Sequence, residues 1–184
     1  YKTFMWPKSF WYKIYEPFIR KAAGLGVASI EKDNERYEHK YEYCDLLVTG
    51  SGPAGLASAF SAAKSGARVI LVEDKPMFGG SLLTDDVTID NLSGKEWANK
   101  IISELESMPN VITRKRSQVF GYYDHNMVAM FERTGDHLNN KSKYTPRQRL
   151  WYIRAKEVIL STGSIERPIV FGNNDTPGIF LSSG

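Results

Sequence analysis

Apolar positions near the middle of the chain are arranged as two short runs with a helical pattern between them. Residues 46–48 and 68–72 are short runs, apolar apart from Arg68, which predict buried strands. Between them, Ala59 and Ala63 follow Gly55 at four-residue steps, so small side chains share the helix face that must lie against the sheet. The order strand, glycine turn, helix, strand predicts a βαβ unit.

The pattern continues with a helix over 94–108, whose apolar residues recur at helical spacing. Further apolar runs, broken by a turn at 124–126 and a polar loop at 134–147, predict the strands of an antiparallel excursion: 111–113, 117–123, 127–133 and 149–153. A last strand over 155–160 ends in a small polar turn. This order is typical of the α/β class, in a Rossmann-like FAD/NAD(P)-binding domain of the two-dinucleotide reductase type, which has a parallel sheet with an antiparallel strand excursion.

The turn after the first strand reads Gly50-Ser-Gly52-Pro-Ala-Gly55 and carries the candidate chemistry. Gly50 can adopt the turn, Gly52 has no side chain to hold a pyrophosphate away, and Gly55 allows helix and sheet to approach closely. The free N–H groups and positive dipole end of the following helix attract phosphate. Glu73 ends the second strand, where a carboxylate can accept hydrogen bonds from the adenosine ribose. That acid disfavours a 2'-phosphate and therefore NADP, whereas NAD and FAD both remain open.

Two later turns are expected to approach the same groove. Gly79 and Gly80 would let the backbone pass close beside the dinucleotide, and Thr162 and Gly163 should lie beside the first glycine turn. No cysteine follows Gly80, so thiol-disulfide chemistry of the disulfide-reductase kind is excluded.

Composition narrows the function further. With 184 residues, 42% of them hydrophobic and 24% charged, the chain can bury one core. A net charge of +3 with interspersed acids gives no support for nucleic acid binding, and the apolar runs are too short for a membrane span. We therefore expect a soluble, cytoplasmic protein. The one cysteine, Cys44, and three histidines, including His125 in a turn, offer no catalytic or metal-ligating spacing, so a cofactor must supply the chemistry.

The first 43 residues differ in character and are interpreted as an aromatic, basic arm and linker, ahead of a dinucleotide-binding domain over 44–184. Residues 31–43 are interpreted as a charged linker or helix face. Aromatics carry large buried areas, so the arm is expected to dock on the domain, on a missing part of the polypeptide or on a partner. These aromatics are Tyr1, Phe4, Trp6, Phe10, Trp11, Tyr12, Tyr15 and Phe18.

Beyond the fold, the chain resembles the α subunits of heterotetrameric sarcosine oxidases. The resemblance rests on the segments YKTFMWP, YEPFIRKAAGLG, GSGPAGLASA, EDKPMFGGSL, VFGYYDHN, RQRLWYIRAKEVILSTGSIERP and FGNNDTPGIF. It implies an NAD-binding region of a much larger subunit, so this chain is expected to be partial, with its dinucleotide-binding domain incomplete at the C-terminus. In that family sarcosine is oxidised at FAD in the β subunit, electrons pass through FMN to oxygen, and tetrahydrofolate can capture the one-carbon unit.

The resemblance also implies roles for particular residues. None is catalytic and none binds metal. The implied partners are the β, γ and δ subunits and the rest of the α subunit. The implied contacts are Gly50, Gly52, Pro53 and Ala54 with pyrophosphate, Glu73 and Asp74 with ribose, Val119 with adenine, and Gly80, Ser81, Leu82, Ser161, Thr162 and Gly163 with the rest of the groove. Ser51 and Gly55 of the glycine turn are also expected among the cofactor-binding residues.

Two alternatives stay open. FAD in the same groove would make the chain the cofactor half of an amine or pyridine-nucleotide oxidoreductase. An empty groove would make it a noncatalytic docking module whose aromatic arm is the functional surface.

Overall fold

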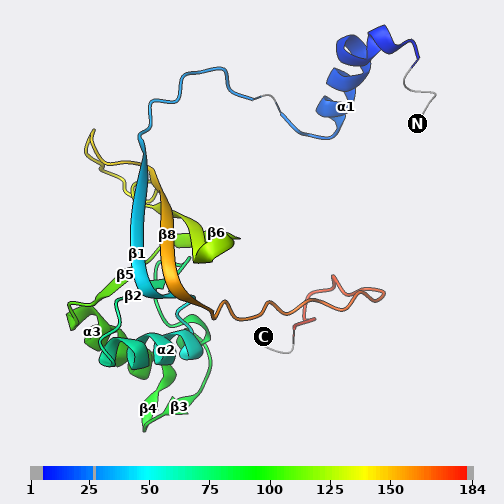
Figure 1. The fold of residues 1–184 in the computed structure, drawn as a ribbon. Helices are drawn as coiled ribbons and strands as arrows, with labels where there is room; N and C mark the ends of the chain where they lie inside the picture. Colours follow the sequence, from blue (N-terminus) through cyan, green and yellow to red (C-terminus); the bar gives the residue numbers. More distant parts are fainter. Residues whose placement is uncertain (1–5, 27, 182–184) are drawn as a thin grey trace. The chain divides into compact units, whose positions relative to one another are not determined.

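The computed structural model describes residues 6–26 and 28–181, which divide into two compact units, Tyr1–Asn34 and Glu35–Gly184. In the first unit, the 3-10 turn η2 (Lys8–Phe10), the π-helical turn η3 (Trp11–Tyr15) and the helix α1 (Glu16–Ala22) follow one another (Figure 1). Arg20 Nε donates to Glu16 Oε1 at 2.6 Å, an i,i+4 pair that supports α1.

The aromatic side chains of this first unit are largely exposed. Trp6 is 80% exposed, Tyr12 81% and Phe18 74%, while Tyr1 and Phe4 lie outside the described residues. Docking of the arm on another surface stays a prediction.

The second unit is built on a mixed sheet of six strands within the part of the chain that the structure describes. Across the sheet the order is β5-β2-β1-β8-β7-β6 (Figure 1). The first four of these strands are parallel, and β8, β7 and β6 pair antiparallel. The strands are β1 (Tyr37–Thr49), β2 (Val69–Val72), β5 (Val111–Arg114), β6 (Ser117–Tyr123), β7 (Met127–Arg133) and β8 (Gln148–Leu160). The predicted α/β class with a parallel sheet and an antiparallel excursion is confirmed.

The predicted βαβ unit is confirmed by β1, α2 (Pro53–Lys64) and β2. Gly55, Ala59 and Ala63 are buried along one face of α2, as their spacing indicated. The helix ends before Gly66, which has a φ of +88°, a conformation that glycine adopts without a steric penalty.

Two apolar clusters cover the two faces of the sheet. On one face, α2 and α3 (Gly94–Ser107) pack against β1 and β2 through Leu56, Leu71 and Leu105, among others. On the other face, Leu47 and Ile70 pack with Met130 and Ile153 from the antiparallel strands. The antiparallel strands therefore cover the face of the parallel strands that the helices leave open. The loops gather at the carboxyl ends of β1 and β2.

The predicted helix over 94–108 is confirmed as α3, which begins with a capping box. Ser93 Oγ accepts from the Glu96 N–H at 3.3 Å, and the Glu96 carboxylate accepts from the Ser93 N–H at 2.9 Å. Ahead of α3 lie the 3-10 turn η4 (Gly80–Leu83) and the small hairpin of β3 (Thr88–Ile89) and β4 (Leu92–Ser93). The short turn η5 (Asp124–Asn126) joins β6 to β7, where a turn was predicted.

Three strand predictions were wrong in part. The charged segment 31–43 is not a linker throughout, because β1 already begins at Tyr37. Its tyrosines and charges alternate, and the charges find partners across the sheet, as Glu38 does with Arg149 Nε at 2.8 Å. Tyr41 likewise stacks on Tyr152, with ring centroids 5.5 Å apart.

The two other differences concern strand pairing. Residues 111–113 do not belong to the antiparallel excursion, since β5 pairs parallel with β2. Residues 149–153 and 155–160 are not two strands but one, β8, which pairs parallel with β1 along its length and antiparallel with β7 at its first half. No described helix is long and apolar enough to cross a membrane.

Candidate dinucleotide-binding site

The glycine turn lies at the carboxyl end of β1, between the ends of β2 and β8. Gly50 has a φ of +96° and donates its N–H to the Val72 carbonyl at 2.8 Å. A β-carbon on Gly50 would lie 2.3 Å from the Ser161 carbonyl oxygen. Both the backbone conformation and the neighbouring strand end therefore require glycine here.

Gly55 is the point of closest approach between α2 and the turn. A β-carbon there would lie 1.9 Å from the Gly50 carbonyl oxygen and 2.7 Å from Ser161 Oγ. The Ser161 hydroxyl lies 2.9 Å from the carbonyl oxygens of both Thr49 and Gly50, to which it can donate. Ser161 thus joins the end of β8 to the end of β1 and holds the turn in place.

The open side of the turn is at Gly52, the residue that precedes the first turn of α2. A β-carbon on Gly52 would meet no atom within 4 Å, and within the described residues no side chain caps the helix there. Pro53 and Ala54 are exposed at this helix start. Free N–H groups and the helix dipole make such a start attractive to a phosphate group.

The second glycine pair, Gly79 and Gly80, lies against this turn. A β-carbon on Gly80 would lie 2.9 Å from the Gly52 Cα, and the Gly79 N–H donates to Ser51 Oγ at 3.1 Å. The sequence prediction named Gly80 as a site residue and omitted Gly79, although the paired glycines marked both. Ser51 and Gly79, which are 28 positions apart in the sequence, thus lie side by side at the candidate site.

Ser51 and Glu73 form a buried pair beside the turn. The Glu73 carboxylate accepts from the Ser51 N–H at 3.1 Å, from the Ser51 hydroxyl, and from the Lys75 N–H at 3.1 Å. Ser51 is 0% and Glu73 6% exposed. The carboxylate predicted to bind ribose therefore also fixes the glycine turn, a role that its sequence position did not reveal.

Asp74 and Val119 lie next along the same edge. Asp74 is exposed, and its carbonyl accepts from Arg133 Nη2 at 2.8 Å. Val119 is half-buried in β6, beside a register shift of that strand. The N–H of Ser117, at the start of β6, donates to the Glu73 carbonyl at 2.8 Å and so brings β6 to the end of β2. Ser117 was not among the predicted site residues.

The remaining predicted residues fall into two groups. Ser81 is exposed, but the Leu82 side chain is 3% exposed within the core cluster, so it does not face a groove. Thr162 and Gly163 are exposed after β8, and the Thr162 Cα would lie 3.3 Å from a β-carbon on Gly50. The ends of β1, β2 and β8 and the turn at Gly80 thus meet at one edge, as the sequence predicted, while the binding roles stay predictions.

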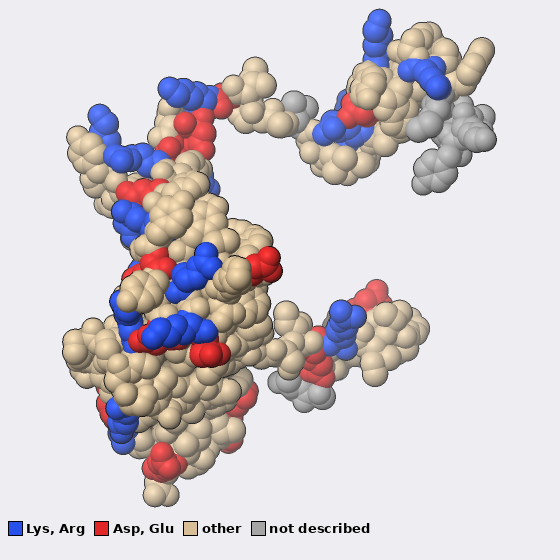
Figure 2. Space-filling model, viewed as in Figure 1, with Lys and Arg blue, Asp and Glu red and all other residues tan. Residues whose placement is uncertain are grey.

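Other reactive groups do not gather at this edge. Burial raises the pKa of the Cys44 thiol to about 12, so it is protonated at neutral pH. Within the described residues, no three His, Cys, Asp or Glu side chains are placed to hold a metal ion. On the face shown in Figure 2, basic and acidic side chains are interspersed.

Comparison with known proteins shows which proteins this chain resembles. The chain is 50% identical to the sarcosine oxidase subunit alpha of Rhizobium meliloti (strain 1021) over 182 residues, which are 99% of this chain and 18% of that protein. It is 42% identical to the sarcosine oxidase subunit alpha of Corynebacterium sp. (strain U-96), over 87% of this chain and 17% of that protein. The chain thus spans less than a fifth of the length of these curated relatives.

Among solved structures, the L-proline dehydrogenase from P. horikoshii matches with a TM-score of 0.60 at 22% identity, over 83% of this chain and 28% of that chain. That likeness shows the fold. The family model of FAD dependent oxidoreductases matches residues 45–138, a little over half of the chain, from the end of β1 to the loop after β7. The chain therefore belongs to the FAD dependent oxidoreductase family.

Proposed function

We propose that this chain is the NAD-binding part of a sarcosine oxidase α subunit and contributes to the oxidative demethylation of sarcosine to glycine. The observation that carries this proposal is the open space at Gly52, at the uncapped start of α2. A pyrophosphate placed there would accept hydrogen bonds from the helix N–H groups, with no side chain in its way. The 50% identity to a sarcosine oxidase subunit alpha supplies the reaction.

In this proposal the surrounding residues bind the other parts of NAD. The exposed Asp74 and the carboxylate of Glu73 bind the adenosine ribose, and the backbone at Val119 contacts adenine. Gly80, Ser81, Thr162 and Gly163 line the remaining groove, with Leu82 limited to its backbone. Ser161 positions the turn, since its hydroxyl faces the carbonyls of Thr49 and Gly50.

FAD is the second candidate for the same groove. The family match, whose description names FAD, favours it, and the adenosine half of the two dinucleotides is the same. NAD comes first because the resemblance to sarcosine oxidase α subunits implies it. NAD in this groove requires no catalytic side chain from this chain, because in this proposal the amine is oxidised elsewhere in the assembled enzyme.

The proposal includes partners and place of action. A subunit named alpha belongs to a multi-subunit enzyme, so we propose β, γ and δ subunits as partners, with FAD and FMN bound outside this chain. We further propose a cytoplasmic enzyme that feeds one-carbon metabolism. The exposed aromatic arm is the proposed contact with the rest of the assembly.

A substitution at Gly52 tests the site directly. Gly52→Val places a side chain where the pyrophosphate would lie, and Gly52 has no positive φ that would strain the change. We expect NAD affinity, measured by calorimetry on the intact protein, to fall by about two orders of magnitude, because overlap with a phosphate removes its helix N–H bonds. The melting temperature without ligand should change little. Unchanged NAD affinity would refute the assignment of the site.

A further inference from the structure

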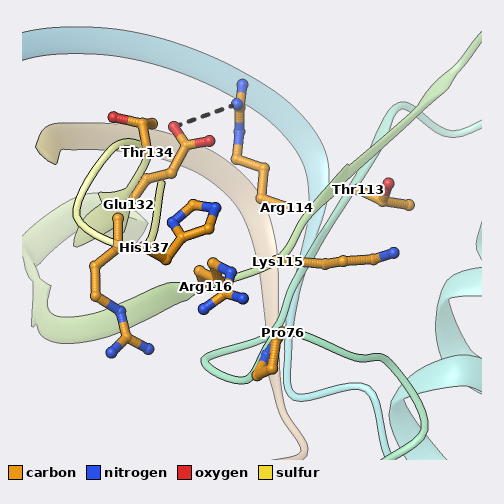
Figure 3. A pocket seen from close by; sticks show the side chains of 9 residues that line it. Pro76, Thr113, Arg114, Lys115, Arg116, Glu132, Thr134 and His137 are labelled. Atoms are coloured by element: carbon orange, nitrogen blue, oxygen red, sulfur yellow. Dashed lines mark ion pairs between the residues drawn. The ribbon is translucent and has the colours of Figure 1, made fainter. Parts of the chain in front are cut away.

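A recess lies among the ends of β5 and β7 and the loop after β2. It has a volume of about 390 Å³ (Figure 3). We call it the basic pocket, and the residues that matter for its chemistry are Pro76, Arg114, Arg116, Glu132, Arg133 and His137. None of these residues belongs to the predicted dinucleotide site.

The acids near the basic pocket are already engaged by cations. Arg114 Nη2 lies 2.6 Å from Glu42 Oε2, and its guanidinium stacks on Trp151, 3.9 Å from the ring centroid. The Glu132 carboxylate accepts from Trp151 Nε1 at 2.8 Å and lies 3.7 Å from Arg149 and 3.9 Å from Arg114. Arg149 also pairs with Glu38 at 2.8 Å, and Asp136 Oδ1 lies 3.4 Å from His137 Nδ1. Within the described residues no ion pair joins an acid to Arg116 or Arg133, so the charge of these two arginines is unmatched.

Arg116 and Arg133 supply this unmatched charge. Arg133 donates through Nη2 to the Asp74 carbonyl, but its Nε is buried and, within the described residues, has no hydrogen-bond partner. The Nε of Arg114 is likewise buried and has no hydrogen-bond partner within the described residues. The Arg116 side chain makes no ion pair or hydrogen bond with the described residues, and Figure 3 shows it on the His137 side of the pocket, whereas Lys115 extends away.

A buried guanidinium donor without a partner is unfavourable, and an anion in the pocket would satisfy it. Arginines bind carboxylate and phosphate in a planar, bidentate way, and several unmatched cations together favour an anion that carries two charges. We propose that the basic pocket binds a phosphate monoester group. Arg116 and Arg133 are its ligands, and His137 stands at its rim.

The pocket shares a wall with the predicted ribose contacts. The Lys75 carbonyl accepts from the Arg116 N–H at 3.0 Å, and the Asp74 carbonyl accepts from Arg133. The phosphate belongs either to the 2' position of a dinucleotide in the groove or to a separate phosphorylated molecule. The first source rests on the proposed groove but not on NAD itself, which has no 2'-phosphate. Glu73, the acid that disfavours a 2'-phosphate, is only 6% exposed and bonds Ser51 and Lys75.

The test titrates inorganic phosphate into the intact protein already saturated with NAD, at constant ionic strength set with chloride. The variant is Arg116→Gln, which keeps a β-carbon and so leaves the backbone at φ +53° equally strained. Lys100→Gln, an exposed lysine on α3, removes the same charge elsewhere. We expect saturable binding that Arg116→Gln weakens about tenfold or more and Lys100→Gln leaves unchanged.

A second arm separates the two sources. In the protein without NAD, 2',5'-ADP should bind about tenfold more tightly than 5'-AMP, which lacks only the 2'-phosphate, if the phosphate sits on the ribose. Arg116→Gln should abolish that preference. Equal binding of the two, with phosphate still bound by the NAD-saturated protein, indicates a separate ligand. Absence of both phosphate binding and the 2',5'-ADP preference would overturn the proposal, as would equal losses in the variant and the control.

The two proposals fail in distinguishable ways. NAD affinity measured on the same samples reports on the proposed function alone. If NAD does not bind, phosphate is titrated into the ligand-free protein, and a loss specific to Arg116→Gln still supports the basic pocket. Normal NAD binding without any phosphate effect removes only the basic pocket.

Discussion

The hydroxyl of Ser161 and the missing side chain of Gly55 act on the same few atoms at the end of β1. Ser161 faces two consecutive carbonyls, those of Thr49 and Gly50, and Gly55 leaves room for the second of them. The Ser161 hydroxyl and the bond from the Gly50 N–H to the Val72 carbonyl therefore hold the turn in place through groups of the protein itself. Preorganisation of this kind lowers the entropic cost of binding.

Gly55→Ala should therefore destabilise the protein, because the new methyl group would overlap the Gly50 carbonyl oxygen. We expect a loss of about 3 kcal/mol in the free energy of unfolding, the upper end for overpacking, measured by urea denaturation. Gly52→Ala, which makes the same chemical change in open space, is the matched control and should cost less than about 1 kcal/mol. Equal losses in the two variants would contradict the geometry of the turn.

At this scale the sequence predicted the residues of the glycine turn but not the hydrogen bonds that hold the turn. A glycine motif is local, so its spacing was sufficient to place Gly50, Gly52 and Gly55. The bond between Ser51 and Glu73 joins residues 22 positions apart, and it depends on how β2 lies beside β1. Leu82 was assigned to the groove for a related reason, since only the packing of α3 shows that its side chain belongs to the core.

Among the elements, the long strands β1 and β8 were the least predictable. β1 runs from a charged, tyrosine-rich half into an apolar half, whereas β8 has buried apolar residues in its first half and charged residues, Lys156 and Glu157, in its second. Each strand therefore has two hydrophobic patterns along its length. Tyrosines and charged residues alternate over 37–43, which is typical of a strand with one solvent-exposed face. Because so few of these residues are apolar, the segment was interpreted as a linker. Short strands with one environment, such as β6 and β7, were predicted with the observed bounds.

Helix α3 has the most specific local stabilisation among the elements. Its capping box satisfies one N–H at the helix start and one at Ser93. Ser93→Ala should reduce the free energy of unfolding by about 1 kcal/mol, as measured by urea denaturation. Ser107→Ala makes the same change at the last residue of α3, where the hydroxyl bonds the Glu104 carbonyl at 2.6 Å. If both variants lost the same stability, the cap would have no special role.

At the scale of the whole domain, three surface carboxylates link folding to pH. The pKa of Glu38 is lowered by its hydrogen bond with Arg149, that of Asp45 by Lys156 and the Arg68 N–H, and that of Glu96 by Ser93. A carboxylate with a lowered pKa in the folded state contributes stability that is fully present above its unfolded pKa and is lost as the pH falls through the folded value.

The melting temperature should therefore be level near neutral pH and fall once the pH drops below about 4.5, where these groups begin to take up protons in the unfolded chain. Asp45→Asn removes one of the linked groups and should make the fall shallower. Asp86→Asn, at an exposed position, should leave the profile unchanged. A wild-type melting temperature that rose between pH 5 and 3 would contradict these pKa directions.

The function of the whole molecule depends on which dinucleotide the groove holds. The fold accommodates the adenosine half that NAD and FAD share, and no residue at the glycine turn distinguishes them. The direct measurement is the visible absorption spectrum of the purified intact protein and its separate subunits, followed by mass spectrometry of the molecules that heat releases. Our account predicts that the subunit that carries this chain's groove releases NAD when Gly52 is intact and none in Gly52→Val, while any flavin bound elsewhere in the protein is unchanged by the substitution. FAD released from this groove, and lost in the same variant, would contradict it.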